Sequence, residues 1–262
     1  MTGLAQAGAH LWSLPGVGRY TLITARVLGL VLLASGISTL RVPPWLQGLT
    51  VLWLSAALWS VVPPGPSPTG WALLPASVLQ IGLGILMGLV LAVPLWAWQQ
   101  AGYLLVDVLG LGLAGPNTPG VAPAPDGLPG WFLLLIFIAF LAGGGLPLTV
   151  LALHASFQAW PLTLTVLPPS TPAVVGGVLG SLLAMSLTVA APALAVGVGG
   201  LLTAGIVSRT MPQAPIYFVA LPAVIGAVLG ISVLATPVWL AWAPALWQTT
   251  WLTLSHVLTL PG

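Results

Sequence analysis

Long apolar segments, separated by short breaks rich in proline and glycine, dominate this sequence. The segments 20–40 and 45–62 are each close to the length of about 20 residues that a helix needs to cross the hydrocarbon core of a bilayer. Only 2% of the 262 residues are charged and 58% are hydrophobic, whereas about a quarter of the residues in a soluble domain are charged. The sequence therefore predicts an all-α, multi-pass integral membrane protein.

The later apolar segments are longer than one membrane crossing requires. They cover residues 73–109, 173–208 and 216–260. In the first of them, Pro94 predicts a kinked or broken helix, because proline removes a backbone donor. Helix tilt averages only about 20°, so we expect re-entrant hairpins or helices that stand partly outside the bilayer. The segment 131–159 carries glycines and a proline in its middle and fits either a helical hairpin or a hinged helix.

The scarcity of charged side chains excludes several classes of function. Four arginines, two aspartates and no lysine cannot form the clustered basic surface that binds nucleic acid. The chain has no cysteine and no cluster of His, Asp and Glu at metal-ligand spacing, so we expect neither a metal nor a cofactor. Two isolated acids also leave no paired carboxylates and no nucleophile–base couple. We therefore predict that the protein is not an enzyme.

Arg26 and Asp107 are the two charges that lie well inside apolar segments. Each would cost about 2.5–3.5 kcal/mol at the centre of a membrane helix unless it were paired or hydrated. The favoured interpretation is structural, with each charge held in an ion pair or by carbonyl groups. A proton relay or an ion site is the alternative.

Pairs of glycines four residues apart occur in three of the long segments. They are Gly84 and Gly88, Gly176 and Gly180, and Gly226 and Gly230. Small residues at this spacing let two helix backbones approach closely, so these helices are predicted to have close neighbours. Packing within the chain is the favoured interpretation, and contact with other subunits is the alternative.

The segment 110–130 is too rich in glycine and proline for a regular helix, yet it carries almost no charge. A fully solvated linker is normally more polar, so we expect this segment to lie against protein. Its candidate functional residues are Gly110, Gly112, Gly115, Pro116, Asn117, Pro119, Gly120, Pro123 and Pro125.

Short motifs follow one another along nearly the whole chain. They are Arg26, Val42-Pro43, Ala101-Gly102, Gly110, Pro119, Pro129-Gly130, Gly144-Gly145 and Trp160-Pro161. The most specific is a polar turn with Arg209, Pro212 and Gln213, which precedes an apolar segment that contains Pro222. Together these motifs resemble the export-apparatus subunit T family of type III secretion systems, called SctT or YscT in injectisomes and FliR in flagella. The Gly-Gly and Trp-Pro motifs are similar to the injectisome branch.

The resemblance implies an architecture and a function. A member of this family looks like an R-like part, here approximately 1–172, fused to an S-like part, here 173–262. It would join R-like and S-like subunits, with the U-like switch subunit as a further expected partner, in a hetero-oligomer of the bacterial inner membrane. Unfolded proteins would leave the cytoplasm through this export gate. By position, the loop 110–130 would be the plug that closes the channel, and its glycine and proline content suits a segment that fills a lumen.

Two other classes of function remain open from the residues. A small-molecule secondary transporter would use broken helices around a midplane site, with Asp107 as its coupling residue. That reading requires internal repeats, and we find none that is convincing. A membrane assembly scaffold that conducts nothing would account for the same packing glycines.

Overall fold

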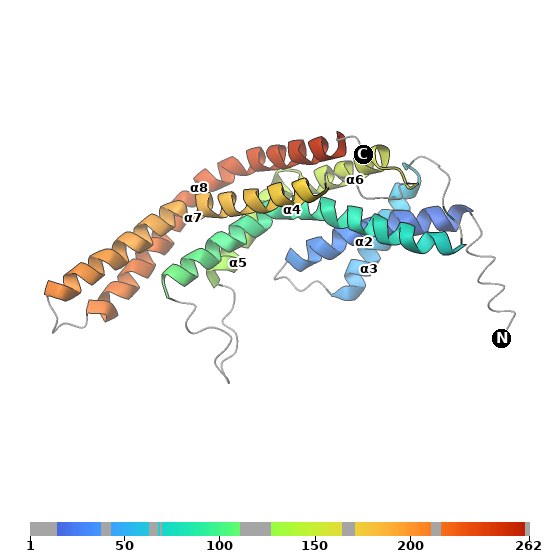
Figure 1. The fold of residues 1–262 in the computed structure, drawn as a ribbon. Helices are drawn as coiled ribbons and strands as arrows, with labels where there is room; N and C mark the ends of the chain where they lie inside the picture. The colour runs from blue at the N-terminus through green and yellow to red at the C-terminus, as the bar shows by residue number, and fades with distance from the viewer. Residues whose placement is uncertain are drawn as a thin grey trace, which may run out of the picture. The chain divides into compact units, whose positions relative to one another are not determined.

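The described part of the chain is helical throughout, apart from short turns, and contains no strand (Figure 1). The computed structural model describes residues 15–37, 43–62, 68, 70–110, 127–163, 171–210 and 216–259. Its elements are α2 (Pro15–Ile37), α3 (Pro44–Trp59), the 3-10 helix η1 (Gly70–Ala72), α4 (Leu73–Val108), α5 (Gly127–Ala142), α6 (Gly145–Ala159), α7 (Thr171–Thr210) and α8 (Ile216–Thr259). The predicted all-α class is confirmed.

Prolines mark the starts of several helices. Pro44 is the first residue of α3, and Pro75, Pro129 and Pro172 lie in the first turns of α4, α5 and α7. Proline is tolerated there because the backbone N–H that it lacks would have no partner within the helix. The prediction that residues 110–130 avoid regular helix is therefore wrong for the last four of them, which form the first turn of α5.

The three longest helices are continuous. α4 contains Pro94, α7 contains Pro192, and α8 contains Pro222, Pro237 and Pro244, yet none of these prolines ends its helix. The predicted break in α4 does not occur, and re-entrant hairpins do not account for the length of α7 or α8. An internal proline costs about 3 kcal/mol. A break in an apolar setting would expose more backbone groups, each at several kcal/mol, so the continuous helix is favoured.

The segment 131–159 does contain a break, which separates α5 from α6 at Gly143 and Gly144. Gly143 donates its N–H to the carbonyl of Ala139 at 2.8 Å and closes the last turn of α5. Gly144 has φ +74°, in the left-handed region that side chains disfavour. Glycine is therefore required where the chain leaves one helix and enters the next.

Close contacts divide the chain into two compact units. Unit 1 comprises residues 1–93, 144–179 and 248–262, and unit 2 comprises residues 94–143 and 180–247. The helices α4, α7 and α8 contribute to both. This division does not test the expected R-like and S-like parts, which stay a prediction.

In unit 1, α2 packs beside α3 and crosses α4 at a pair of glycines. A Cβ on Gly84 would collide with the carbonyl oxygen of Arg26 and would lie 3.0 Å from the backbone nitrogen of Leu30. A Cβ on Gly29 would collide in the same way with the carbonyl oxygen of Ile81. The two backbones are thus in direct contact, as small residues in membrane helices allow.

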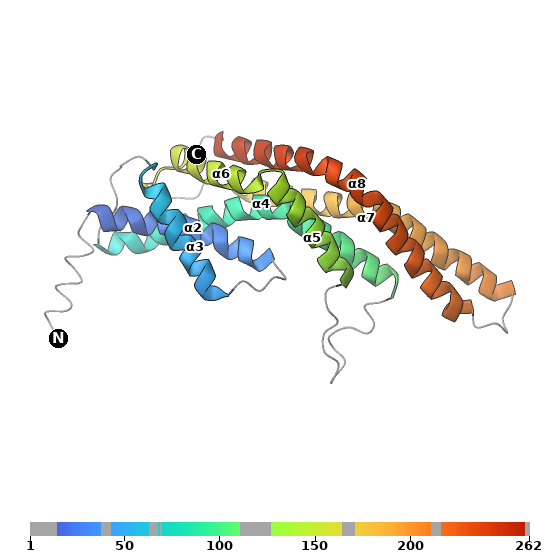
Figure 2. The ribbon, with the colours of Figure 1, turned by 180° about the vertical axis from the view of Figure 1, so that it is seen from behind.

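Unit 2 contains similarly close helix contacts. A Cβ on Gly102 of α4 would lie 2.5 Å from the Cα of Pro129 on α5. A Cβ on Gly200 of α7 would lie 2.6 Å from a methyl group of Val224 on α8. These two helices run side by side in both views of the molecule (Figures 1 and 2). The glycines on each helix therefore decide where the helices of this unit touch.

Four of the described helical stretches are long and apolar enough to cross a membrane, and the broken pair α5 and α6 could supply a fifth. The four windows are Gly16–Leu33, Gly70–Val108, Val175–Thr210 and Val219–Trp242. Each exceeds the shortest length, about 17 residues, that spans the hydrocarbon core. The chain is a multi-pass membrane protein.

The crossing of α2 and α4 predicts an asymmetry between glycines. Gly84→Ala should lower the free energy of unfolding by about 3 kcal/mol, the upper end of overpacking costs, because its Cβ would meet backbone that cannot move alone. Gly230→Ala is the matched control, since no other part of the described chain lies within 4 Å of its Cβ position. Denaturant unfolding of the purified chain in detergent measures the free energy of unfolding of both variants. Equal values for the two variants would contradict the backbone contact.

Candidate functional site

The guanidinium of Arg26 lies fully buried among α2, α4 and α6. Its Nε donates to Oε1 of Gln80 at 2.7 Å. Nη1 donates to the carbonyl oxygen of Ser156 at 2.8 Å and to its Oγ at 3.2 Å. Nη2 donates to the carbonyl oxygen of Trp160 at 2.8 Å. The sequence left open an ion pair, carbonyl groups, a proton relay or an ion site for this charge. In the structure, carbonyl groups hold it, together with the side chains of Gln80 and Ser156.

The C-terminal end of α6 supplies the charge that Arg26 needs. The last carbonyl groups of a helix lack partners within the helix and together carry about half a negative charge. Trp160 is the C-cap of α6, so its carbonyl is one of these groups, and the carbonyl of Ser156, which also accepts from the N–H of Trp160, lies in the same last turn. The guanidinium also lies 4.3 Å from the ring centroid of Phe157, a favourable cation–π distance. A buried cation is thus stabilised without an acidic side chain.

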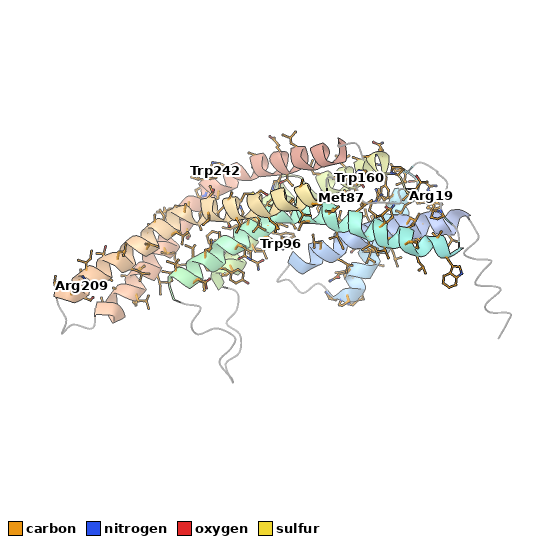
Figure 3. All side chains as sticks on the ribbon, viewed as in Figure 1. Arg19, Met87, Trp96, Trp160, Arg209 and Trp242 are labelled. Atoms are coloured by element: carbon orange, nitrogen blue, oxygen red, sulfur yellow. The ribbon has the colours of Figure 1, made fainter. Side chains whose placement is uncertain are left out.

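Arg19 makes the corresponding contacts with the end of α3. Its Nη2 donates to the carbonyl oxygen of Trp59 at 2.9 Å and also to that of Val62. Its guanidinium lies 4.3 Å from the centroid of the Trp59 ring. The side chain is only partly buried, and Figure 3 labels it on α2. Two arginines of one helix therefore each bind the C-terminal end of another helix.

Gln80 fixes the orientation of Arg26 but leaves one group of its own unpaired. Its Oε1 accepts from Arg26, which orients the amide, and its buried Nε2 then finds no acceptor. A buried donor without a partner costs about 1–3 kcal/mol. The hydrogen bond to the charged guanidinium, worth a comparable amount, offsets this cost.

Among the described residues of unit 2, two buried indole groups have an N–H without an oxygen or nitrogen partner. These belong to Trp98 and Trp247. Trp98 meets the ring of Trp239 in an edge contact, with centroids 5.6 Å apart, and Trp247 meets Phe140 in the same way at 4.7 Å. Aromatic faces are weak acceptors, and edge-to-face pairs are favourable in their own right. The rings tie α4, α5 and α8 together within this unit, where Phe132 completes the Trp98 cluster.

Asp107 has a different environment from Arg26. It is exposed in the last turn of α4, and its carbonyl oxygen accepts from the N–H of Gly110 at 3.1 Å. The expectation that it lies deep in an apolar segment is wrong, because α4 ends one residue later, at Val108. The described part of the chain therefore does not bury this carboxylate.

The structure describes only part of the predicted plug and of the family turn. Gly110 closes the turn after α4 with φ +68°, and Arg209 is exposed in the last turn of α7. The remaining candidates lie outside the described residues, and these are Gly112, Gly115, Pro116, Asn117, Pro119, Gly120, Pro123, Pro125, Pro212 and Gln213. Their roles stay predictions.

The three glycine pairs fall into two groups. Gly84 and Gly88 face α2, and a Cβ on Gly88 would lie 3.1 Å from the Cβ of Leu33. For the other pairs, Gly176 with Gly180 and Gly226 with Gly230, no other part of the described chain lies within 4 Å of the Cβ positions. Among the described residues, packing within the chain therefore accounts for the first pair and not for the other two.

The open glycines belong to helices that the chain itself hardly covers. The share of buried residues is 50% in the span of α4, but 28% in that of α7 and 17% in that of α8. Large apolar side chains are exposed along the same two helices, among them Leu183, Leu187 and Leu202 on α7 and Val233, Leu234 and Trp242 on α8. Figure 3 labels one of them, Trp242, on α8. These two helices present apolar surface to their surroundings.

Motifs that are far apart in the sequence meet within each unit. Arg26 binds the carbonyl of Trp160 in unit 1, and Gly102 packs on Pro129 in unit 2. Sequence reasoning did not pair these residues, and it missed the roles of Arg19 and Gln80. One available signal was the spacing of the two arginines, which lie seven residues apart and therefore on one face of a helix.

The described residues contain no group of three or more His, Cys, Asp and Glu side chains that could hold a metal ion. Nε2 of His154 lies 3.2 Å from the amide nitrogen of Gln158, one turn further along α6. Hydroxyl groups mostly donate to the preceding turn of their own helix, as expected in apolar helices, with Ser55 and Ser232 as buried examples. These hydroxyl groups therefore donate to backbone carbonyl groups of their own helices.

The helical spans, the buried arginine and the uncovered apolar helices define a multi-pass membrane protein. The family model of bacterial export proteins, family 1, matches residues 17–250. The chain belongs to this family, which is that of SctT and FliR, and the predicted resemblance is confirmed. It is a bacterial export-apparatus protein of a transport family. No curated protein matches the chain significantly.

The geometry around Arg26 predicts that lysine cannot replace it. Arg26→Lys should lower the free energy of unfolding by about 2 kcal/mol, because a single ammonium group cannot reach acceptors on both α4 and α6, and bonds to a charged group contribute about 1.5–3 kcal/mol each. Arg209→Lys, at the exposed end of α7, should change it by less than about 0.5 kcal/mol. Unfolding midpoints of the purified variants measure the difference, and an unchanged Arg26→Lys midpoint would refute the assignment.

Proposed function

We propose that this protein is a subunit of the type III protein export gate, in the bacterial inner membrane. With R-like and S-like subunits it would form the channel through which unfolded proteins leave the cytoplasm. The observation that carries this proposal is the family match over residues 17–250, which covers almost all of the chain. The protein would act through shape and packing, without catalysis and without a cofactor.

The uncovered faces of α7 and α8 support a role inside a hetero-oligomer. Lipid does not require glycine, whereas close approach of another helix does. Gly180 on α7 and Gly230 on α8 leave room for such an approach, because no other part of the described chain lies within 4 Å of their Cβ positions. R-like and S-like subunits are the partners that we assign to these faces, with the U-like switch subunit as a further partner.

The segment 110–130 is proposed as the plug that closes the channel at rest. α4 ends immediately before it, and the left-handed Gly110 turns the chain out of that helix. Its many glycines and prolines disfavour a helix, and it lacks lysine and arginine. Because residues 127–130 begin α5, only the part of the segment that precedes them can fill a lumen and leave it again without breaking regular structure.

The exposure of Asp107 weighs against a secondary transporter. A coupling residue in such a protein lies at a protected midplane site between broken helices. Asp107 instead lies in the last turn of a continuous helix. An assembly scaffold without a conduit would share the packing surfaces, and only a measurement of conductance separates it from a gate.

Removal of the plug should open the assembled channel. Deletion of residues 115–125 is expected to make membranes that contain the complex leaky to small ions, because nothing else is proposed to fill the lumen at rest. Single-channel conductance in planar bilayers measures this, with the complex of the unaltered chain as the control. A deleted complex that assembles and still conducts nothing would count against the plug and favour the scaffold.

The open glycines should matter for assembly and not for folding. Gly180→Leu and Gly230→Leu are expected to reduce recovery of the complex with R-like and S-like subunits by about tenfold or more, because one clash at a close helix contact costs on the order of 1–3 kcal/mol. Gly48→Leu, at an open glycine of α3, is the matched control. Native mass spectrometry after co-expression reports the complex, and full assembly of both variants would exclude these faces as interfaces.

A further inference from the structure

The two arginines of α2 share one arrangement, in which each guanidinium binds the C-terminal end of a different helix. Arg19 receives its acceptors from the end of α3, and Arg26 receives most of its acceptors from the end of α6. Each guanidinium also lies 4.3 Å from the centroid of an aromatic ring on that same helix. The oxygen atoms bound by the two groups are carbonyl, amide and hydroxyl oxygens, and none belongs to a carboxylate.

α3 and α6 both lack a positive charge of their own at the C-terminal end. Neither helix has a basic residue in its last turn, so neither can neutralise its own C-terminal carbonyl groups. In an apolar environment those carbonyl groups are expensive to leave without a donor. An arginine from a neighbouring helix supplies both the donors and the positive charge.

A buried apolar residue follows each helix end. Val62 lies three residues after the end of α3 and is 3% exposed, and Leu162 lies three residues after the end of α6 and is 6% exposed. Val62 itself provides one of the carbonyl groups that Arg19 binds. The arginine contacts therefore coincide with the points where the chain leaves each helix and remains packed.

We propose that α2 acts as a double strap, in which Arg19 holds the chain that leaves α3 and Arg26 holds the chain that leaves α6. The two fastenings have no acceptor in common. Seven residues of helix also separate them by about 10 Å along the axis, a distance at which independent sites usually behave additively. Each fastening therefore opens without the other, and the exit from α6 and the exit from α3 are two separate local transitions of unit 1.

The absence of cysteine from the chain allows a direct test with single reporters. Val62→Cys and Leu162→Cys are introduced separately, each into the unaltered full chain, the Arg19→Met chain and the Arg26→Met chain, all in native membranes. The rate of labelling with N-ethylmaleimide measures how often each exit opens. Arg26→Met should raise the labelling rate at position 162 about tenfold and change the rate at position 62 by less than about twofold. The reason is that local opening exposes only the chain that follows the helix whose arginine has been removed. Arg19→Met should produce the reverse pattern.

Arg209→Met is the matched control, since it removes an exposed arginine from the end of α7 and should change neither rate. Arg26→Lys keeps the charge with fewer bonds and should give a smaller increase, again confined to position 162. If either methionine variant accelerates both reporters, or loses the folded chain altogether, the two fastenings are not independent and the proposal is overturned. Unchanged rates at both positions would overturn it as well, because the arginines would then hold neither exit.

Discussion

A buried guanidinium that is satisfied without a carboxylate is the central polar contact among the helices of unit 1. Arg26 joins α2, α4 and α6 through four hydrogen bonds and a cation–π contact. A chain with two acids in 262 residues cannot rely on ion pairs, so helix ends take the place of carboxylates. The same solution recurs at Arg19, which indicates that helix C-termini are the main counter-charges of this unit.

Glycine contacts place the helices that the arginines then fasten. Gly29 and Gly84 bring α2 and α4 into backbone contact, and this brings Gln80 of α4 within reach of Arg26. Unit 2 uses glycines in the same way but holds its helices with aromatic rings in place of a buried charge. The open glycines of α7 and α8 have the same chemistry, but no other part of the described chain lies against them. They are the helix contacts that we propose for another subunit of the export apparatus.

Prolines show where local reasoning was insufficient. Pro94 predicted a kinked or broken helix, and α4 continues through it without a break, because exposing more backbone in an apolar setting costs more than one lost hydrogen bond. Pro129 belonged to a predicted loop and instead begins α5, where its missing donor is harmless. At Gly144 the local sequence and the structure agree. The glycines predicted a hairpin or hinge, and the left-handed Gly144 ends the helix whatever surrounds it.

By itself, the sequence determined the helical class, the membrane location, the family, and the need for Arg26 to find partners, because each of these follows from composition, apolar length or motif order along the chain. Tertiary structure alone decided which residues are the partners of Arg26. Gln80 lies 54 residues from Arg26 and Ser156 lies 130 residues away, so no local pattern could pair them. Tertiary structure also decided which glycines are filled and which are open, because that depends on where a second backbone passes and not on the glycine itself.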